Sequence, residues 1–184
     1  MNNQNVSNTR ILKLCMLGDG GVGKTTFIER IVTGKFNSST KMTIGVDFQV
    51  LHRVLKSDDE DPMNLTISVW DLGGESQFRF ILPSYITGAN GGLLMYDASR
   101  YVTSTHLSEW VELWRENTKK GIPLFLLGSK LDKTQPGMMS ILELEIHRLK
   151  NELQLDTHFL VSSKTGDNIS EVLDKITREM VNSL

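Results

Sequence analysis

The clearest chemical signal in this chain is a glycine-rich stretch, Gly18-Asp-Gly-Gly-Val-Gly-Lys24-Thr25. It fits the pattern G-x-x-x-x-G-K-[ST], in which glycines let the backbone turn so tightly that consecutive N–H groups point at an anion. The ammonium group of Lys24 would reach the β- and γ-phosphates of a nucleotide, and the Thr25 hydroxyl would bind Mg²⁺. The sequence therefore predicts a site for a nucleoside triphosphate.

The segments on either side of this loop provide the context that a phosphate site requires. An apolar run at 11–17 precedes the loop, and a helical pattern begins at residue 24. A helix that starts at the end of such a loop directs its free N–H groups at the phosphates. The residues expected to contact nucleotide from this segment are Gly20, Gly21, Val22, Gly23, Lys24, Thr25 and Thr26.

Along the rest of the chain, short apolar runs alternate with amphipathic segments, which is typical of a parallel sheet crossed by helices. The sequence therefore predicts an α/β fold. Trp110 and Trp114 are four residues apart on one helical face, which we expect to lie in the core. We expect strands at 11–17, 46–55, 65–71, 92–97, 122–128 and 158–161, helices at 24–33, 77–86, 103–118, 138–153 and 169–181, and a hairpin tip in the acidic run at 57–62.

The composition fits one globular domain and excludes several classes of function. The chain has 184 residues, of which 39% are hydrophobic and 23% charged, and its net charge of -2 gives no indication of nucleic acid binding. We predict a disordered extension at 1–10, where the residues are polar, and a single domain at 11–184. The only cysteine, Cys15, lies in an apolar run and is expected to be a buried structural thiol. The histidines lack the spacing of zinc ligands or of a catalytic triad.

A phosphate loop alone fits kinases, ATPases and GTPases, so the residues that would read the base distinguish between them. The motif Gly128-Ser-Lys-Leu-Asp132 follows the fifth expected strand. A carboxylate at Asp132 can accept hydrogen bonds from N1–H and the N2 amine of guanine, whereas facing adenine it would lose them. The apolar stem of Lys130 could pack over the purine, and the backbone N–H of Ser163 could donate to guanine O6. The sequence therefore predicts a preference for guanine.

With these motifs in place, the chain resembles the Ras superfamily of small GTPases, and most closely the Rab branch. The resemblance runs from about residue 11 to 182 and rests on GDGGVGKT at 18, TIGVDF at 43, WDLGG at 70, GSKLD at 128 and SSKTGDN at 162. It implies a three-layer P-loop NTPase fold, with a six-stranded, mostly parallel sheet and helices on both faces. It also implies GTP or GDP and Mg²⁺ as bound cofactors, and we expect a monomer.

The resemblance assigns roles to individual residues of the two switch regions. Thr43 would face Mg²⁺ and the γ-phosphate, Asp71 would hold Mg²⁺ through water, and the Gly74 N–H would bond the γ-phosphate. Because these contacts vanish with the γ-phosphate, they are the physical basis of a two-state switch. The implied metal ligands are Thr25, Thr43 and Asp71. The implied contacts to the guanosine are Phe36, Ser129, Lys130, Asp132, Ser162, Ser163 and Lys164.

Partner proteins are also implied. Phe48, Trp70 and Tyr85 match positions at which Rab proteins present an aromatic surface to effectors, although core packing is an alternative for Phe48 and Trp70. Exchange factors and GTPase-activating proteins would contact the same switch regions. The C-terminus carries no cysteine for a lipid, so we expect no stable membrane anchor in this chain. With no signal peptide or membrane span apparent either, we expect a cytoplasmic protein that reaches membranes through partners.

One departure from the family pattern concerns catalysis, because Glu75 stands where the family has a water-orienting glutamine. A carboxylate only accepts hydrogen bonds, and it brings negative charge towards the γ-phosphate. At an effective dielectric near 20, each like charge at about 4 Å costs roughly 4 kcal/mol before screening. Slow hydrolysis is therefore predicted, with a base role for Glu75 or replacement by Gln77 as alternatives. The expected catalytic residues are Glu75, Lys24, Thr43 and Gly74.

A second departure is Ser129, which stands where the family has the asparagine of the guanine motif. Because other branches place a hydroxyl there, we expect only a modest loss of nucleotide affinity. Two hypotheses of function therefore stand. In one, the chain is an enzyme and a switch that cycles between GTP and GDP. In the other, it is a binding module that holds GTP almost permanently. A nucleoside kinase is a weaker third hypothesis, because no motif in the sequence indicates a site for a substrate that would accept the phosphoryl group.

Overall fold

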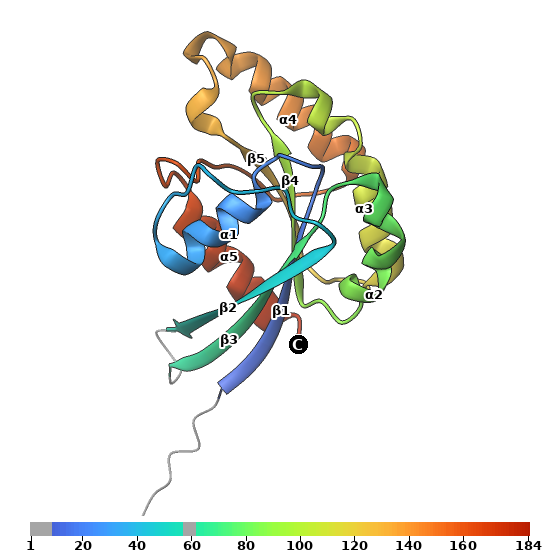
Figure 1. Cartoon of the computed structure of the whole chain (residues 1–184), viewed down its shortest axis with the longest axis vertical. Helices are drawn as coiled ribbons and strands as arrows, with labels where there is room; N and C mark the ends of the chain where they lie inside the picture. The colour runs from blue at the N-terminus through green and yellow to red at the C-terminus, as the bar shows by residue number, and fades with distance from the viewer. Residues whose placement is uncertain (1–8, 57–61) are drawn as a thin grey trace, which may run out of the picture.

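The apolar runs of the sequence form one six-stranded sheet in the computed structural model, which describes residues 9–56 and 62–184 (Figure 1). The strand order is β2-β3-β1-β4-β5-β6, in which β2 is antiparallel to β3 and the other described pairs are parallel. The predicted α/β fold with a mostly parallel sheet is therefore confirmed. The strands are β1 (Thr9–Leu17), β2 (Val46–Leu55), β3 (Met63–Leu72), β4 (Gly91–Asp97), β5 (Leu124–Ser129) and β6 (His158–Leu160).

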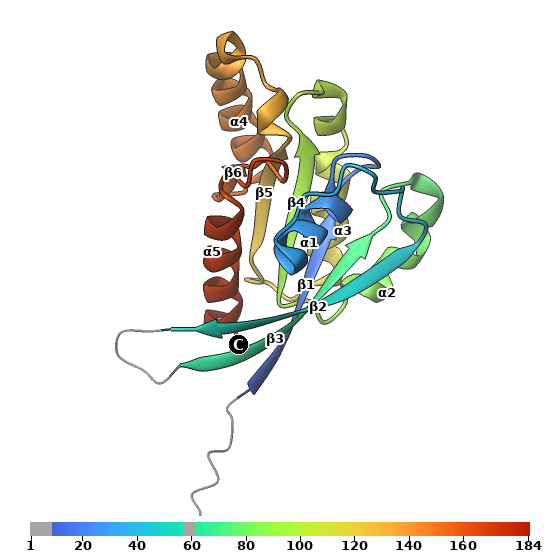
Figure 2. The same ribbon diagram turned by 60° about the vertical axis from the view of Figure 1, so that its left-hand side comes forward.

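Helices cover both faces of this sheet. Side chains along a strand alternate between the two faces, so each inner strand contributes apolar side chains to both helix layers. In β1, Leu14 and Met16 join the apolar cluster that includes residues of α1 and α5, whereas Cys15 and Leu17 join the cluster that includes residues of α2, α3 and α4. This is the predicted three-layer arrangement: Figure 1 shows α1 and α5 on one side of the strands and α2 and α3 on the other, and Figure 2 shows β5, β4 and β1 side by side. The α-helices are α1 (Lys24–Thr33), α2 (Leu82–Ile86), α3 (Leu107–Asn117), α4 (Met139–Leu153) and α5 (Ile169–Asn182).

Buried side chains behave as their patterns predict. Trp110 and Trp114 are 1% and 3% exposed and pack in the core between α3 and the sheet. Cys15 is fully buried, and burial raises the pKa of its thiol to about 12, so the reactive thiolate is strongly disfavoured. Both predictions, a tryptophan core face and a structural cysteine, are confirmed.

Two of the predicted helices are shorter than expected, because local hydrogen bonding starts them later. The segment predicted as a helix at 77–86 divides into a 3-10 helix η1 (Ser76–Ile81) and α2, which begins at Leu82. Pro83 fits the first turn of α2 because it needs no N–H partner there. The predicted helix at 103–118 begins as the 3-10 helix η2 (Tyr101–Ser104), and α3 ends at Asn117. Shorter 3-10 turns, η3 (Leu131–Lys133) and η4 (Pro136–Met138), follow β5.

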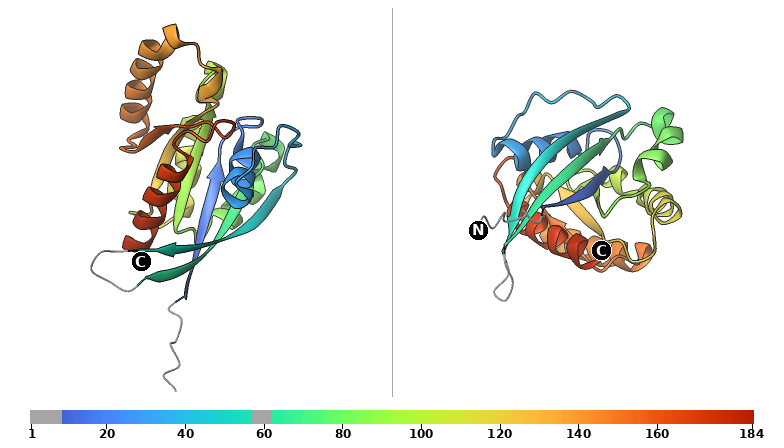
Figure 3. Two further views of the ribbon diagram at one scale, coloured as in Figure 1. Left: turned by 90° about the vertical axis from the view of Figure 1, so that its left-hand side faces the viewer. Right: turned by 90° about the horizontal axis from the view of Figure 1, so that it is seen from below.

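The predicted boundary of the disordered extension, at residue 10, is wrong. Thr9 and Arg10 already belong to β1, where they pair in register with Asn64 and Leu65 of β3. The backbone ladder overrides the polar character of these side chains, because it uses only N–H and C=O groups. Residues 1–8, and the hairpin tip predicted at 57–62 apart from Pro62, lie outside the described residues. Figure 3 shows β2 and β3 side by side at one edge of the sheet.

This topology decides where chemistry can occur. The carboxyl ends of β1, β4, β5 and β6 point the same way, because these strands are parallel. The loops that follow them therefore gather at one edge of the sheet, where ligands of open α/β sheets bind. The glycine-rich loop and both guanine motifs are among these loops.

Candidate functional site

The glycine-rich loop leaves β1 and turns sharply before α1 begins at Lys24. Gly18 has a φ of +130°, and a Cβ atom at this position would lie 2.1 Å from the carbonyl oxygen of Met95 in β4. Only glycine allows the loop to pass this close to β4. The Lys24 Nζ atom then donates hydrogen bonds to the carbonyl oxygens of Gly18 (2.7 Å) and Asp19 (2.9 Å). The loop therefore wraps around its own lysine.

Lys24 is held in a state that favours an added anion. Its side chain is 6% exposed, and burial lowers its pKa to about 8, although the carboxylates of Asp71 and Asp19 act in the opposite direction. A phosphate group in contact with Nζ would supply a full negative charge and stabilise the ammonium form. The lysine is thus prepared for the phosphate role that the motif predicts.

Beside the lysine, two hydroxyl groups converge on one carboxylate. Thr25 Oγ1 and Thr43 Oγ1 donate to Asp71 Oδ2 at 2.5 and 2.9 Å, and the two hydroxyl oxygens are 2.7 Å apart. Asp71 is 3% exposed, and burial raises its pKa, while the hydrogen bond from Thr25 lowers it. Its second oxygen, Oδ1, is buried and has no hydrogen-bond partner in the described part of the chain.

This oxygen cluster fits a hard divalent cation. Mg²⁺ prefers oxygen ligands and is commonly held by one or two protein groups together with substrate phosphates. An unpartnered buried carboxylate oxygen is costly unless a cation or water satisfies it. Within residues 9–56 and 62–184, no group of three or more His, Cys, Asp or Glu side chains could form a different metal centre. Thr25, Thr43 and Asp71 are therefore the residues that would hold Mg²⁺.

The phosphate loop, the first switch segment and the guanine motifs together line a cavity of about 700 Å³. The predicted residues at its wall are Gly20, Gly21, Val22, Gly23, Lys24, Thr25, Thr26, Phe36, Thr43, Gly74, Ser129, Lys130, Asp132, Ser163 and Lys164. Sequence reasoning missed further wall residues, which are Asn37, Ser38, Thr40, Lys41, Met42 and Lys133. Most of these lie between Phe36 and Thr43, so the two motif residues that flank them were a usable signal.

The guanine motifs are fixed by contacts with the phosphate loop and with each other. Ser129 Oγ donates to the carbonyl oxygen of Val22 at 2.6 Å, so this shortened side chain still links β5 to the loop. Ser162 does not line the cavity; it is fully buried, and its Oγ donates to Asp132 Oδ1 at 2.7 Å. The structure therefore puts Ser162 behind Asp132, as a group that orients the carboxylate.

Comparison with known proteins gives the same family from sequence. A model of the Ras family matches residues 13–182 of the chain. The chain belongs to the Ras family. It is 31% identical to the Ras-related protein Rab11B of Nicotiana tabacum over 90% of this chain and 75% of that protein. It is 28% identical to the Ras-related protein rab-11.1 of Caenorhabditis elegans over 94% of this chain and 80% of that protein.

Other relatives are much longer than this chain. The Ras and EF-hand domain-containing protein of Danio rerio is 33% identical over 92% of this chain but only 25% of its own length. The chain spans 28% of the length of the homologous protein of Caenorhabditis elegans, to which it is 29% identical. Ras-family proteins are GTP-binding switch GTPases, so the general prediction of such a domain, similar to Rab proteins, is confirmed.

Of the described helices, none is long and apolar enough to cross a bilayer.

In this Ras-family domain, the loop after β3 touches the phosphate loop through a glycine. A Cβ atom at Gly74 would lie 2.3 Å from the backbone nitrogen of Gly20, so a larger residue would separate the two loops. Glu75, one residue later, is not among the described residues that line the cavity. Its Oε2 instead accepts a hydrogen bond from Gln77 Nε2 at 2.7 Å. In this state the carboxylate is turned to Gln77, and the chain must move for Glu75 to act on a phosphate.

The three aromatic residues matched to the effector surface form one stack. The ring centroids of Phe48 and Trp70 are 5.4 Å apart, and those of Trp70 and Tyr85 are 5.6 Å apart. Phe48 is 56% exposed, which excludes simple core packing for this residue. Trp70 and Tyr85 are half-buried against the core. The stack is therefore a partly exposed aromatic surface next to both switch segments.

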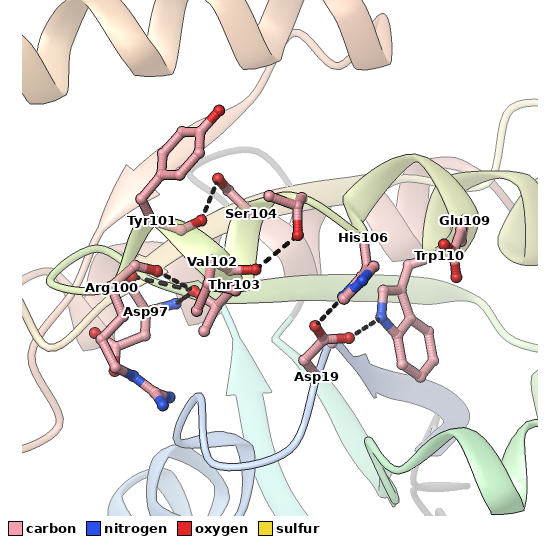
Figure 4. Close-up of polar contacts among 12 residues, drawn as sticks. Asp19, Asp97, Arg100, Tyr101, Val102, Thr103, Ser104, His106, Glu109 and Trp110 are labelled. Atoms are coloured by element: carbon pink, nitrogen blue, oxygen red, sulfur yellow. Dashed lines mark hydrogen bonds and ion pairs between the residues drawn. The ribbon is translucent and has the colours of Figure 1, made fainter.

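Two carboxylates near the phosphate loop were not singled out from the sequence. Asp19 accepts hydrogen bonds from His106 Nδ1 (2.8 Å) and Trp110 Nε1 (2.9 Å), which ties the loop to α3 (Figure 4). Asp97 ends β4 and is 1% exposed. A charged residue at the carboxyl end of a buried strand lies at the ligand edge of the sheet, and that position was the available signal for Asp97.

Proposed function

We propose that this chain is a guanine-nucleotide switch, which binds GTP and GDP with Mg²⁺ and hydrolyses GTP slowly. The observation that carries this proposal is the composition of one cavity wall. A buried ammonium group (Lys24), two hydroxyl groups (Thr25 and Thr43) and a base-reading carboxylate (Asp132) lie along it. Both hydroxyl groups donate to Asp71, a buried carboxylate whose Oδ1 atom has no hydrogen-bond partner in the described part of the chain. These groups match the phosphates, the metal and the base of one ligand.

Each group has a chemical role in this proposal. Lys24 and the N–H groups of the phosphate loop bind and orient the phosphates, and Mg²⁺ would neutralise part of their charge when bound. Asp132 accepts hydrogen bonds from the guanine edge, while Ser162 holds it in position. Phe36, which is 40% exposed at the rim, covers the base. Thr43 and Gly74 contact the γ-phosphate and are released when it is lost.

A competition titration tests the proposal directly. In the presence of Mg²⁺, GDP and GTP should displace a bound fluorescent GDP analogue at low concentration, whereas ATP and ADP should not do so even at large excess. The reason is that adenine offers Asp132 no pair of donors, so the hydrogen bonds that guanine would donate to this carboxylate are lost. Comparable displacement by ATP and GTP would contradict the assignment.

Switching is expected in two segments. Residues 37–45 and 72–83 should exchange amide hydrogens more slowly with a non-hydrolysable GTP analogue than with GDP, since Thr43 and Gly74 gain a γ-phosphate partner. Hydrogen exchange with mass spectrometry measures this difference, and α5 serves as the internal reference because it lies outside the cavity wall. Equal exchange of both segments in the two nucleotide states would mean that the chain does not switch through them.

A second candidate function is a binding module that holds GTP with very little turnover. It is favoured by one observation, the hydrogen bond from the Gln77 amide to the Glu75 carboxylate, because it holds both side chains to each other and neither lines the cavity. In either case, effectors, exchange factors and GTPase-activating proteins would meet the surface built by Phe48, Trp70 and Tyr85. The aromatic stack and its exposure support this surface as the site of contact.

A further inference from the structure

Two cationic side chains converge on a single carbonyl oxygen of the phosphate loop. Lys130 Nζ and Arg100 Nη2 donate to the oxygen of Gly21 at 2.8 and 3.2 Å. Lys130 comes from the guanine motif, whereas Arg100 comes from the loop between β4 and α3. Figure 4 shows the guanidinium group of Arg100 extending from that loop. The phosphate loop is thus held from two separate segments of the chain.

The carboxylate of Asp97 binds both of these cationic side chains. Its Oδ2 atom accepts hydrogen bonds from Arg100 Nε at 2.7 Å and from Lys130 Nζ at 2.8 Å, and its Oδ1 accepts from the hydroxyl of Ser99 at 2.6 Å. Burial alone would raise the pKa of Asp97, yet the hydrogen bonds from Lys130, Ser99 and Arg100 outweigh it and lower the pKa. The carboxylate therefore stays charged and fixes both donors.

The loop that carries Arg100 is itself closed by hydrogen bonds. The Arg100 N–H donates to the carbonyl oxygen of Asp97 at 2.9 Å, and the hydroxyl of Thr103 donates to the carbonyl oxygen of Arg100 at 2.8 Å. The same hydroxyl accepts from the N–H of Asp97 at 2.9 Å. These bonds fix the backbone at Arg100, and its planar guanidinium group then holds Asp97 through Nε and the Gly21 carbonyl through Nη2.

We propose that Arg100 is a positioning residue of the nucleotide site, which together with Asp97 fixes the Gly21 carbonyl and so slows the release of guanine nucleotide. This inference rests on the proposed function. Arg100 is not among the described residues that line the cavity, so it acts through the loop and not on the ligand.

The physical reason is that this part of the loop is intrinsically flexible. Gly20, Gly21 and Gly23 lose much conformational freedom when they are ordered around a phosphate. Because two cationic donors already hold the Gly21 carbonyl, the loop is partly ordered before nucleotide binds, and less conformational entropy is lost on binding. The carbonyl of Gly21 also belongs to the same peptide unit as the N–H of Val22, and donors on the oxygen polarise this N–H towards the phosphates.

The test compares the release of a fluorescent GDP analogue from the wild-type chain, from Arg100→Ala and from Arg148→Ala. Arg148 lies on α4, makes ion pairs with Glu145 and Glu152, and its side chain is 47% exposed, as that of Arg100 is. Release should be about tenfold faster from Arg100→Ala and unchanged in Arg148→Ala. Because Arg100 is half-exposed at the surface, both variants should melt within a few degrees of the wild-type chain.

A second readout separates positioning from a general loosening of the fold. The phosphorus-31 resonance of the β-phosphate of bound GDP should shift in Arg100→Ala and not in Arg148→Ala, because only the first change alters the polarised peptide at Val22. Release from Arg100→Ala at the wild-type rate, or an unshifted β-phosphate resonance, would overturn the inference. Failure of the wild-type chain to bind GDP would instead contradict the proposed function, so the two failures are distinguishable.

Discussion

Replacing Asp132 by Asn is expected to reverse the base preference of this chain from guanine to xanthine nucleotides. An asparagine still accepts from N1–H through its oxygen, but its NH₂ group would face the N2 amine of guanine, donor against donor. Xanthine carries a carbonyl oxygen at that position and accepts the hydrogen bond instead. Two hydrogen bonds to a charged acceptor are at stake, each worth ~1.5–3 kcal/mol, so GDP affinity should fall by roughly two to four orders of magnitude.

The structure gives reason to expect that the variant keeps its shape. Ser162 Oγ donates to Asp132 Oδ1, and an asparagine oxygen can accept this hydrogen bond equally well. Titration with GDP and XDP measures the change, and Asp156→Asn is the matched control, because Asp156 is exposed in the turn between α4 and β6 and is not at the cavity wall. If Asp132→Asn bound GDP as before and gained nothing for XDP, Asp132 would not be the base reader.

The second large effect is expected at Glu75. Glu75→Gln should raise the single-turnover rate of GTP hydrolysis by about ten- to a hundredfold. Once segment 72–83 moves so that residue 75 faces the cavity, the change removes a carboxylate that would oppose charge on the γ-phosphate, and it provides an amide that both donates to and accepts from water. A like charge at about 4 Å costs roughly 4 kcal/mol at an effective dielectric of 20, and screening by Lys24 and Mg²⁺ reduces this value.

The measurement must follow cleavage of GTP that is already bound, because faster nucleotide exchange would also raise multiple-turnover rates. Glu143→Gln makes the same change of charge on the exposed face of α4 and should leave the rate as it is. An unchanged or lower rate in Glu75→Gln would show that Glu75 is not the brake.

Two further variants then distinguish the alternatives for this position. If Glu75 acts as a base, Glu75→Ala should lose activity, whereas a bystander should lose little. If Gln77 orients the water instead, Gln77→Ala should lose activity while Glu75→Ala does not. The contact between the two side chains means that each variant also frees the other, so the double variant belongs in the same series.

The sequence by itself determined the fold class and most of the cavity wall, because both depend on local patterns. Strand periodicity and helical periodicity gave the α/β alternation, and a phosphate loop is a contiguous segment whose geometry its own glycines and lysine dictate. The same holds for Lys130 and Asp132, which directly follow the end of β5 at Ser129. The boundaries of the elements depend on more than local pattern: residues 9 and 10 belong to β1 because β3 pairs with them.

Only the tertiary structure decided how segments far apart in the chain meet. Nothing in the sequence brings Arg100 and Lys130 onto the same carbonyl oxygen of Gly21, since that requires β1, β4 and β5 to lie side by side with their carboxyl ends together. The orientation of Ser162 behind Asp132 likewise depends on the pairing of β5 with β6. Periodicity fixes which face a side chain takes on its own element, whereas contacts between elements depend on strand order, and strand order is a property of the whole packed sheet.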